Sequence, residues 1–230
     1  MLVVGFPTGA FQANCYLLAA GRGEPCVIVD PGQDAAEPVL DAIRQYDLSP
    51  VAVLLTHGHF DHTFAVAPVC DGTDIPAWIH PADRRMLSDP LSGVSTEAAA
   101  FFGGKLEMRE PRQVELLADG AELDLAGLLL TVDHTPGHTG GSVTFRTGTE
   151  EGGRLMLSGD TLFAGSIGRS DLPGGDPARL MESLRGKVLP LPDDTVVLPG
   201  HGPTTTIGRE RVTNPFLLEL VPAPAQHRGL

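Results

Sequence analysis

The stretch LLTHGHFDHT, from Leu54 to Thr63, contains three histidines and an aspartate within six positions, directly after an apolar run. His57 and His59 are two residues apart just beyond a predicted strand. In extended chain, residues i and i+2 point the same way, so both imidazoles can reach one point. Asp61 and His62 follow where the chain turns and more easily face a second point. Imidazole and carboxylate suit Zn²⁺ and, less selectively, Fe²⁺ or Mn²⁺, so this stretch predicts a metal site.

Three more candidate ligands share a pattern in which an apolar strand leads into a sharp glycine turn and a coordinating side chain. They are His138 in LLLTVDHTPGHTGGS, Asp160 in RLMLSGDTLF and His201 in TVVLPGHGP. Glycines let the backbone bend at the end of a strand and leave the side chain projecting into a common cleft. The three matching strand ends and the histidine-rich stretch at 57–62 are too similar in their ligands to be a coincidence. We therefore predict that all seven side chains form one metal site. The remaining histidines, His80, His134 and His227, are interpreted as ordinary hydrogen-bonded residues.

The composition indicates a folded globular protein and argues against a nucleic-acid partner. The 230-residue chain is 42% hydrophobic and 20% charged, and its formal net charge is −13. It has no long run of Lys or Arg, whereas proteins that neutralise nucleic-acid phosphates show a basic stripe. The same argument excludes an anionic membrane surface, and no apolar stretch reaches the roughly 18 residues of a spanning helix.

The N-terminus and the cysteines favour a cytoplasmic protein. No Lys or Arg precedes Arg22, and polar residues interrupt the mildly apolar N-terminus, so we expect no signal peptide. Cys15, Cys26 and Cys70 are odd in number and far apart, with no Cys-x-x-Cys pair. This predicts free thiols in a reducing compartment. The sequence does not predict the oligomeric state.

The order of predicted elements is that of one α/β domain. Strands are expected at 2–6, 14–20, 25–32 and 51–56, and a helix at 34–46 with Pro38 in its first turn. Strand, helix, strand is the βαβ pattern. Short strands return from Gln113, with a hairpin predicted at Asp119–Gly120.

Towards the C-terminus we expect a helix over 176–188 with Asp176 as its N-cap, a strand at 195–202 and a closing helix or turn at 209–220. Segment 89–112 is the least regular part and is either a covering loop or a surface connection. We expect a single domain over residues 1–220 and a loose tail over 221–230.

The motifs NCYLL, IVDPG, THGHFDH, HTPGHT, SGDTLF and PGHGP together resemble the metallo-β-lactamase fold superfamily over nearly the whole chain. The resemblance implies an α/β (α+β) fold, a four-layer αββα sandwich with two divalent metal ions at one edge. Zinc is the first expectation, with iron or manganese as alternatives. The implied ligands are His57, His59 and His138 for one ion and Asp61, His62 and His201 for the other, with Asp160 bridging both and Asp30 supporting the metal-binding loops from behind.

The motifs GDTLFAGSIGRSDLPGGD and GPTTTIGRERVTNPF resemble the short hydroxyacylglutathione hydrolase (glyoxalase II) branch. Arg169 falls where that family places a basic residue at the thiol-carrier part of its substrate. Full-length glyoxalase II enzymes have a C-terminal helical extension with further carrier-binding residues. This sequence has no counterpart to it, which leaves the carrier open.

The resemblance implies hydrolysis of a small anionic thioester. A two-metal site lowers the pKa of a bound water from 15.7 to about 7, and the resulting hydroxide would attack the carbonyl while Asp160 or Asp61 orients it. A thiolate leaves without a strong general acid. Two ions give about +4, and two carboxylates and a hydroxide remove about 3, so roughly +1 remains. Arg169 adds to this charge, unless it pairs with Asp171.

Other functions stay open at this point. Persulfide dioxygenases look similar but use one iron, which His57, His138 and Asp160 would hold here. Lactone hydrolysis uses the same metal chemistry. A β-lactamase is less favoured, because the common di-zinc subgroup has Cys where Asp160 stands, and RNA processing is disfavoured by the acidity. A purely structural metal site is disfavoured, because structural zinc is usually closed by four protein ligands whereas seven ligands for two ions leave open positions.

Overall fold

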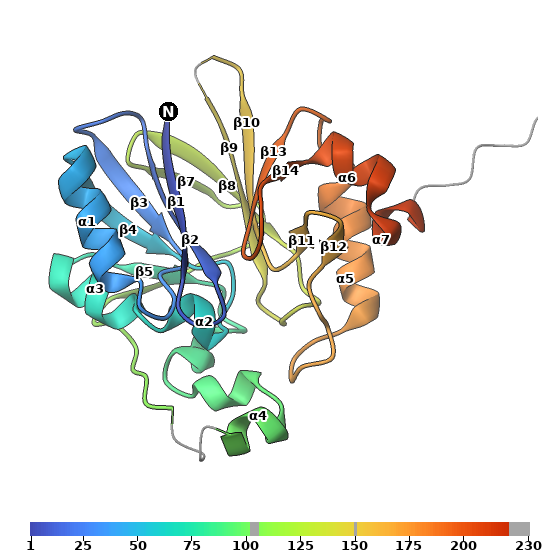
Figure 1. Ribbon diagram of the computed structural model, residues 1–230, viewed down its shortest axis with the longest axis horizontal. Coiled ribbons are helices and arrows are strands. Elements are labelled where there is room, and N and C mark those ends of the chain that lie inside the picture. The colour runs from blue at the N-terminus through green and yellow to red at the C-terminus, as the bar shows by residue number, and fades with distance from the viewer. Residues whose placement is uncertain (102–105, 150, 221–230) are drawn as a thin grey trace, which may run out of the picture.

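The computed structural model describes residues 1–101, 106–149 and 151–220, in which two six-stranded sheets pack face to face (Figure 1). The first sheet has the order β1-β2-β3-β4-β5-β6. Its strands are β1 (Leu2–Thr8), β2 (Ala13–Ala19), β3 (Pro25–Val29), β4 (Ser49–Leu54), β5 (Ala77–Ile79) and β6 (Val114–Leu116). From β3 to β6 the neighbouring strands run parallel, so β4 and β5 end at the same edge.

The second sheet has the order β14-β13-β10-β9-β8-β7. Its strands are β7 (Glu122–Leu125), β8 (Leu128–His134), β9 (Val143–Gly148), β10 (Arg154–Gly159), β13 (Val196–Pro199) and β14 (Thr205–Thr206). The short strands β11 (Leu162–Phe163) and β12 (Ser166–Ile167) form a separate ribbon. Strands β10 and β13 are parallel, and their ends therefore lie side by side.

Helices cover the outer face of each sheet (Figure 1). The first sheet carries α1 (Ala36–Tyr46) and α3 (Val66–Thr73); the second carries α5 (Pro177–Ser183), its π-helical continuation η3 (Leu184–Val188), α6 (Ile207–Thr213) and α7 (Pro215–Leu218). Four short helices lie at one end of the sandwich: α2 (Phe60–Thr63), η1 (Arg84–Leu87), η2 (Pro90–Gly93) and α4 (Thr96–Phe101).

Three hydrophobic cores separate four layers, which confirms the predicted αββα sandwich. In β2, Leu17 faces the core under α1 and α3, whereas Leu18 faces the core between the sheets. In β10, Leu157 faces the core between the sheets and Met156 the core under α5 and α6. Successive side chains of a strand point to opposite faces, so a strand buried on both faces becomes a continuous apolar run.

The hairpin predicted at Asp119–Gly120 is wrong. Strand β6 before it pairs with β5 in the first sheet, whereas β7 after it pairs with β8 in the second, so this segment crosses between sheets. The two-residue hairpin lies instead at Ala126–Gly127, where both residues have positive φ, 55° and 70°. Two positive φ values are those of a type I′ turn, which matches the twist of paired strands.

Other predicted elements are confirmed with shifted ends. The first helix begins at Ala36 rather than Asp34, and segment 89–112 contains η2 and α4. Helix α3 was not predicted. The three cysteines are buried free thiols, as expected. Among the described residues no helix combines the length and apolar character needed to cross a bilayer. The predicted loose tail, 221–230, lies outside the described residues.

Helix α5 depends on the cap that the sequence predicts. The Asp176 carboxylate accepts hydrogen bonds from the backbone N–H groups of Ala178 and Arg179 at 2.9 and 3.1 Å. Asp176→Ala should therefore lower the free energy of unfolding by about 1 kcal/mol in urea denaturation. Asp194→Ala removes only an exposed ion pair with Arg154 and should change it by less than about 0.5 kcal/mol. Equal effects of both substitutions would contradict this account.

Candidate metal centre

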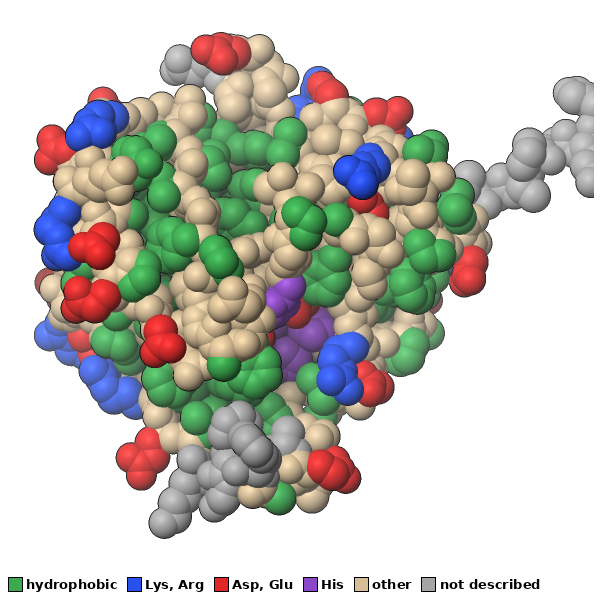
Figure 2. All heavy atoms as spheres, in the orientation of Figure 1, with side chains coloured by type: hydrophobic (Ala, Val, Ile, Leu, Met, Phe, Trp, Pro, Cys, Tyr) green, Lys and Arg blue, Asp and Glu red, His purple; other side chains and the backbone are tan. Residues whose placement is uncertain are grey.

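All seven predicted ligands converge at the edge where strands of both sheets end. His57 and His59 lie just beyond β4, and α2 carries Asp61 and His62. His138, Asp160 and His201 follow β8, β10 and β13 of the second sheet. Figure 2 shows histidine side chains at the base of a hollow between the two halves of the molecule. The sequence pattern of strand, glycine turn and ligand therefore does bring these side chains together.

Three imidazoles form the first group. The Nε2 atom of His138 lies 2.9 Å from Nδ1 of His59 and 3.3 Å from Nε2 of His57. Burial lowers the pKa of His59 and of His138 to about 4, and burial together with the neighbouring imidazoles lowers that of His57 well below its usual range. All three rings are therefore neutral at pH 7, which is the form in which an imidazole binds a metal ion.

Asp61, His62 and His201 form the second group. Nε2 of His201 lies 3.1 Å from Nε2 of His62 and 3.3 Å from a carboxylate oxygen of Asp61. Burial alone would lower the pKa of His62, but the carboxylates of Asp160 and Asp61 outweigh it and raise this pKa to about 10. Burial would raise the pKa of Asp61, but His62 and His201 hold it well below its usual range. This group is therefore charged where the first is neutral.

Asp160 lies between the two groups. Its Oδ2 atom is 3.5 Å from Nε2 of His138 and 3.6 Å from Nε2 of His201, while Oδ1 is 3.5 Å from Nε2 of His62. Burial raises the pKa of the Asp160 carboxyl, against the lowering effect of His62 and His201. One carboxylate therefore faces both groups, as the predicted bridging role requires.

Asp30 orients the ligand stretch from behind. One oxygen accepts hydrogen bonds from Nδ1–H of His62 at 3.0 Å and from the Thr56 hydroxyl at 2.6 Å. The other accepts from the Thr56 backbone N–H at 2.8 Å. Asp30 itself is buried with φ of 49°, a conformation that costs energy in a non-glycine residue. A carboxylate on the far nitrogen of an imidazole fixes which nitrogen faces the centre.

The donor set fits two divalent ions. In each group the three ligand atoms lie within 4.8 Å of one another. Among the described residues, Nε2 of His59 and Oδ1 of Asp160 are buried and make no hydrogen bond. A buried polar atom without a hydrogen bond is unfavourable unless another group or an ion satisfies it. Three protein ligands per ion leave positions open, as in catalytic rather than structural zinc sites.

A cavity of about 430 Å³ lies over this centre. Its walls are largely apolar, and Phe11 packs edge-to-face on Phe60 with ring centroids 5.3 Å apart. Beyond the ligands, the lining residues are Phe11, Phe60, Gly93, Val94, Ser95, Phe163, Arg169 and Leu172. Segment 89–112 thus contributes to the cavity through residues 93–95.

Arg169 lines the cavity, but its guanidinium forms an ion pair with Asp171. It donates two hydrogen bonds to Asp171, at 2.8 and 2.9 Å, and both side chains are exposed. Its backbone carbonyl accepts from Nδ1 of His138 at 2.7 Å. The sequence left a choice between a substrate contact and this ion pair, and the pair forms. An exposed pair is weak, so an anion in the cavity can compete for Arg169.

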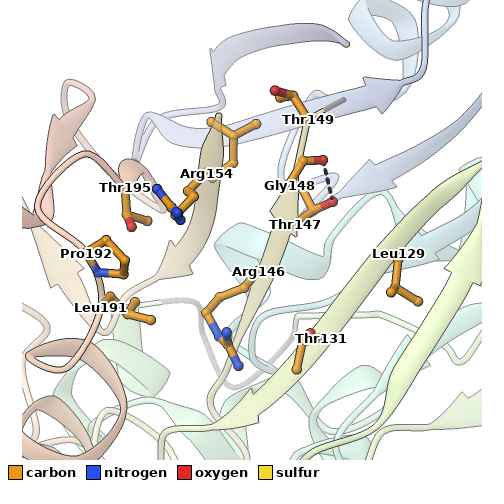
Figure 3. Close-up of a pocket in the computed structure, with 11 residues that line it drawn as sticks. Leu129, Thr131, Arg146, Thr147, Gly148, Thr149, Arg154, Leu191, Pro192 and Thr195 are labelled. Carbon is orange, nitrogen blue, oxygen red and sulfur yellow. Dashed lines mark hydrogen bonds between the residues drawn. The ribbon is translucent and has the colours of Figure 1, made fainter. Parts of the chain in front are cut away.

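A larger cavity, about 570 Å³, lies on the outer side of strands β8, β9 and β10 (Figure 3). It contains no histidine among its described lining residues. The guanidinium groups of Arg146 and Arg154 are paired with Asp133 and Asp194. Its size alone therefore does not make it the reactive site.

Sequence reasoning missed the residues that shape and hold the site. The cavity wall at Phe11 and Val94 comes from connecting segments with no motif. Asp83 is buried and contacts the loops of the first group, but no glycine turn stands between β5 and this residue, so the pattern that identified His138 does not identify it. His80 and His134 stack on each other, with centroids 4.1 Å apart.

Comparisons with known proteins agree with this geometry. The family model of the metallo-beta-lactamase superfamily matches residues 8–201. An uncharacterised protein of Mycobacterium tuberculosis is 49% identical over 220 residues, 94% of this chain and 98% of its own. Hydroxyacylglutathione hydrolase GloC of Haemophilus influenzae is 37% identical over 217 residues, 92% of this chain and 95% of its own.

Two solved structures share the whole architecture. The B3 metallo-beta-lactamase BLEG-1 has a TM-score of 0.82 and 39% identity, over 94% of this chain and 99% of the other. TTHA1623 in a di-iron-bound form has a TM-score of 0.76 and 42% identity, over 93% of this chain and 100% of the other.

Metal binding should release more protons from the second group than from the first. A ligand imidazole must be neutral, and His59 and His138 already are, whereas His62 carries a proton up to a pH near 10. At pH 7.5 the zinc ion that binds the second group should therefore release about one proton more than the zinc ion that binds the first group. Calorimetric titration in two buffers of different ionisation enthalpy measures this number, and equal release for both ions would contradict the pKa difference.

Gly200 has no side chain, and the Asp160 carboxylate occupies the space where a Cβ would lie. A Cβ at this position would overlap Oδ1 of Asp160 and lie 2.9 Å from Cε1 of His62. Gly200→Ala should therefore weaken zinc binding by about tenfold or more while the fold is retained, as measured by chelator competition and circular dichroism. A Cβ at Gly72 meets nothing within 4 Å, so Gly72→Ala should bind zinc normally. An unchanged affinity in Gly200→Ala would show that the Asp160 position does not matter.

Proposed function

Because this chain belongs to the metallo-β-lactamase superfamily and is a metallo-hydrolase of that fold, we propose that it hydrolyses a small anionic thioester of the hydroxyacylglutathione type. The observation that carries the proposal is the position of Asp160: its Oδ2 atom faces both His138 of the first group and His201 of the second. Two adjacent groups with open positions, joined by one carboxylate, suit hydrolysis with two ions better than oxidation with one iron.

The proposed thioester rests on the similarity to GloC and on the cavity. GloC is a hydroxyacylglutathione hydrolase that aligns with 92% of this chain. The apolar walls formed by Phe11, Val94 and Phe163 suit the carbon skeleton of an acyl thioester, and Arg169 is a cation at the same cavity. We take zinc as the first metal, and iron as the second because TTHA1623 binds two iron ions.

Different residues would bind the ions and orient the attacking water. Divalent ions held by His57, His59 and His138 and by Asp61, His62 and His201 would supply a water of lowered pKa and a Lewis acid for the carbonyl oxygen. Asp61 lines the cavity and is ionised at neutral pH, since His62 and His201 lower its pKa. Its carboxylate can therefore accept a hydrogen bond from a water there and orient it.

The chemistry of the leaving group and the apolar walls of the cavity determine what else the reaction requires of the protein. A thiolate is a good leaving group, so the reaction needs no strong general acid, and the described cavity residues outside the predicted ligands include none. Phe11 and Phe163 cover apolar parts of a bound substrate and exclude water from them. The proposed partners are small molecules alone, in keeping with a net charge of −13 that repels nucleic acid.

The proposed function is tested by elemental analysis of protein purified without added metal, followed by assays of S-lactoylglutathione and other thioesters. We expect two ions per chain, thioester hydrolysis, and a loss of at least about 100-fold in kcat for Asp61→Ala, which removes both an ion ligand and the water-orienting group. Oxygen uptake with a persulfide and one iron per chain would instead indicate a dioxygenase. Cleavage of a β-lactam such as nitrocefin without thioester hydrolysis would favour the activity named for BLEG-1.

Arg169 and Asp171 should affect substrate binding in opposite directions. Arg169→Ala removes the cation and should raise KM for an anionic thioester by roughly 5- to 10-fold, with kcat nearly unchanged. Asp171→Asn removes the competing carboxylate and should lower KM or leave it unchanged. Steady-state kinetics with a neutral thioester is the control, since neither substitution should change its KM. A fall in kcat for Arg169→Ala with constant KM would assign Arg169 to the chemical step instead.

A further inference from the structure

We propose that Asp83 and Asn14 are positioning residues, each of which holds one second-sheet ligand loop against the first sheet and so fixes one of the two metal groups. The proposal rests on the proposed assignment of the two groups as metal sites. His138 and His201 lie in loops that follow strands of the second sheet, whereas the other ligands of the two groups follow β4 of the first sheet: His57, His59, Asp61 and His62. Each group is therefore complete only if a loop of the second sheet is held in register with the first.

Asp83 ties the loop of His138 to the loop of His57 and His59. One of its oxygens accepts hydrogen bonds from the Gly58 backbone N–H at 2.9 Å and the Thr139 hydroxyl at 2.6 Å. The other accepts from the Gly141 backbone N–H at 2.8 Å. Gly58 lies between the two first-sheet histidines, and Thr139 follows His138 directly. Asp83 thus contacts both chain segments that supply the first group.

The fit around Asp83 is close. Its side chain is almost fully buried, and a Cβ at Gly141 would lie 2.6 Å from its Oδ1. A buried carboxylate that accepts three hydrogen bonds is costly to alter, since each N–H and O–H left without it is also buried. This arrangement therefore specifies the position of the loop rather than merely filling space.

Asn14, in β2 of the first sheet, holds the loop that carries His201. Its side-chain amide donates to the carbonyls of Pro199 and Gly202, both at 2.9 Å, and its backbone N–H donates to the carbonyl of Gly200 at 2.7 Å. These acceptors surround His201 on both sides along the chain. Tyr16, two residues on in β2, donates its hydroxyl to the same Pro199 carbonyl at 2.9 Å.

The two contacts are separate. The side chain of Asp83 bonds to Gly58, Thr139 and Gly141. Asn14 bonds to residues at the end of β13 and just beyond it, namely Pro199, Gly200 and Gly202, so no partner is common to both. Neither residue belongs to a described ligand group. Loss of one contact should therefore loosen one group and leave the other in place, which a general loss of stability would not do.

The experiment measures zinc affinity in proteins reduced to one group each. His201→Ala leaves the first group, and His59→Ala leaves the second. Into each of these we introduce Asp83→Asn, which turns an acceptor into a donor, and Asn14→Asp, which turns a donor into an acceptor. Zinc affinity is measured by competition with a chromophoric chelator, and the fold of the metal-free proteins by circular dichroism and thermal denaturation.

We expect a crossed result. Asp83→Asn should weaken zinc binding by about 10- to 100-fold when only the first group remains, and by less than about 3-fold when only the second remains. Asn14→Asp should show the reverse. Its added negative charge alone would strengthen cation binding, so a weaker affinity reports displacement of the loop. Asp194→Asn, an exposed change far from the centre, should leave both affinities unchanged.

Milder variants cover the case in which a buried substitution prevents folding. Thr139→Val removes one hydrogen bond to Asp83 without changing charge, and Tyr16→Phe removes one to the Pro199 carbonyl; both should follow the same crossed pattern with smaller effects. Equal weakening of both groups, or no weakening of either, would overturn the positioning roles. If the single-group proteins and the unsubstituted chain bind no zinc at all, the metal assignment itself fails.

Discussion

A single carboxylate oxygen of Asp160 faces an imidazole of each histidine group, 3.5 Å from His138 and 3.6 Å from His201. This contact requires that β10 end between β8 and β13 in space and that the first sheet supply its imidazoles from the opposite side. Without ions the arrangement is costly, because it removes ligand atoms from water and leaves Nε2 of His59 and Oδ1 of Asp160 buried without a hydrogen bond. Bound cations reverse that balance, so folding and metal binding are coupled in this architecture.

The two groups differ in charge although both are buried. The first consists of imidazoles alone, and burial keeps them neutral. The second includes Asp61 beside His62, and the carboxylates keep His62 protonated in the absence of an ion. The same fold thus prepares one group to accept a cation directly and the other to exchange a proton for it. Asp30, behind His62, keeps that ring oriented in either state.

Local patterns in the sequence were enough to predict an α/β domain and the convergence of the ligands, whereas the four layers were implied by the resemblance to the metallo-β-lactamase superfamily. A ligand placed after an apolar strand and a glycine must lie at the sheet edge whatever the rest of the chain does, which is why His138 and His201 could be identified. The errors concern contacts distant in sequence. Asp119–Gly120 has the composition of a hairpin, but β6 and β7 belong to different sheets. The contacts of Asp83 and Asn14 likewise join segments 25 to 188 residues apart, which no local pattern encodes.

The cavity walls and the metal ligands come from different parts of the chain. Phe11, Val94 and Leu172 lie in connections between elements, whereas the ligands adjoin strand ends or α2. Surface connections accept substitution and changes of length more readily than buried strands do. Descendants of one ancestor can therefore acquire new substrates by altering these connections while inheriting the reactive centre intact. This separation accounts for how a chain can resemble both a hydroxyacylglutathione hydrolase and a B3 metallo-beta-lactamase at similar levels of identity.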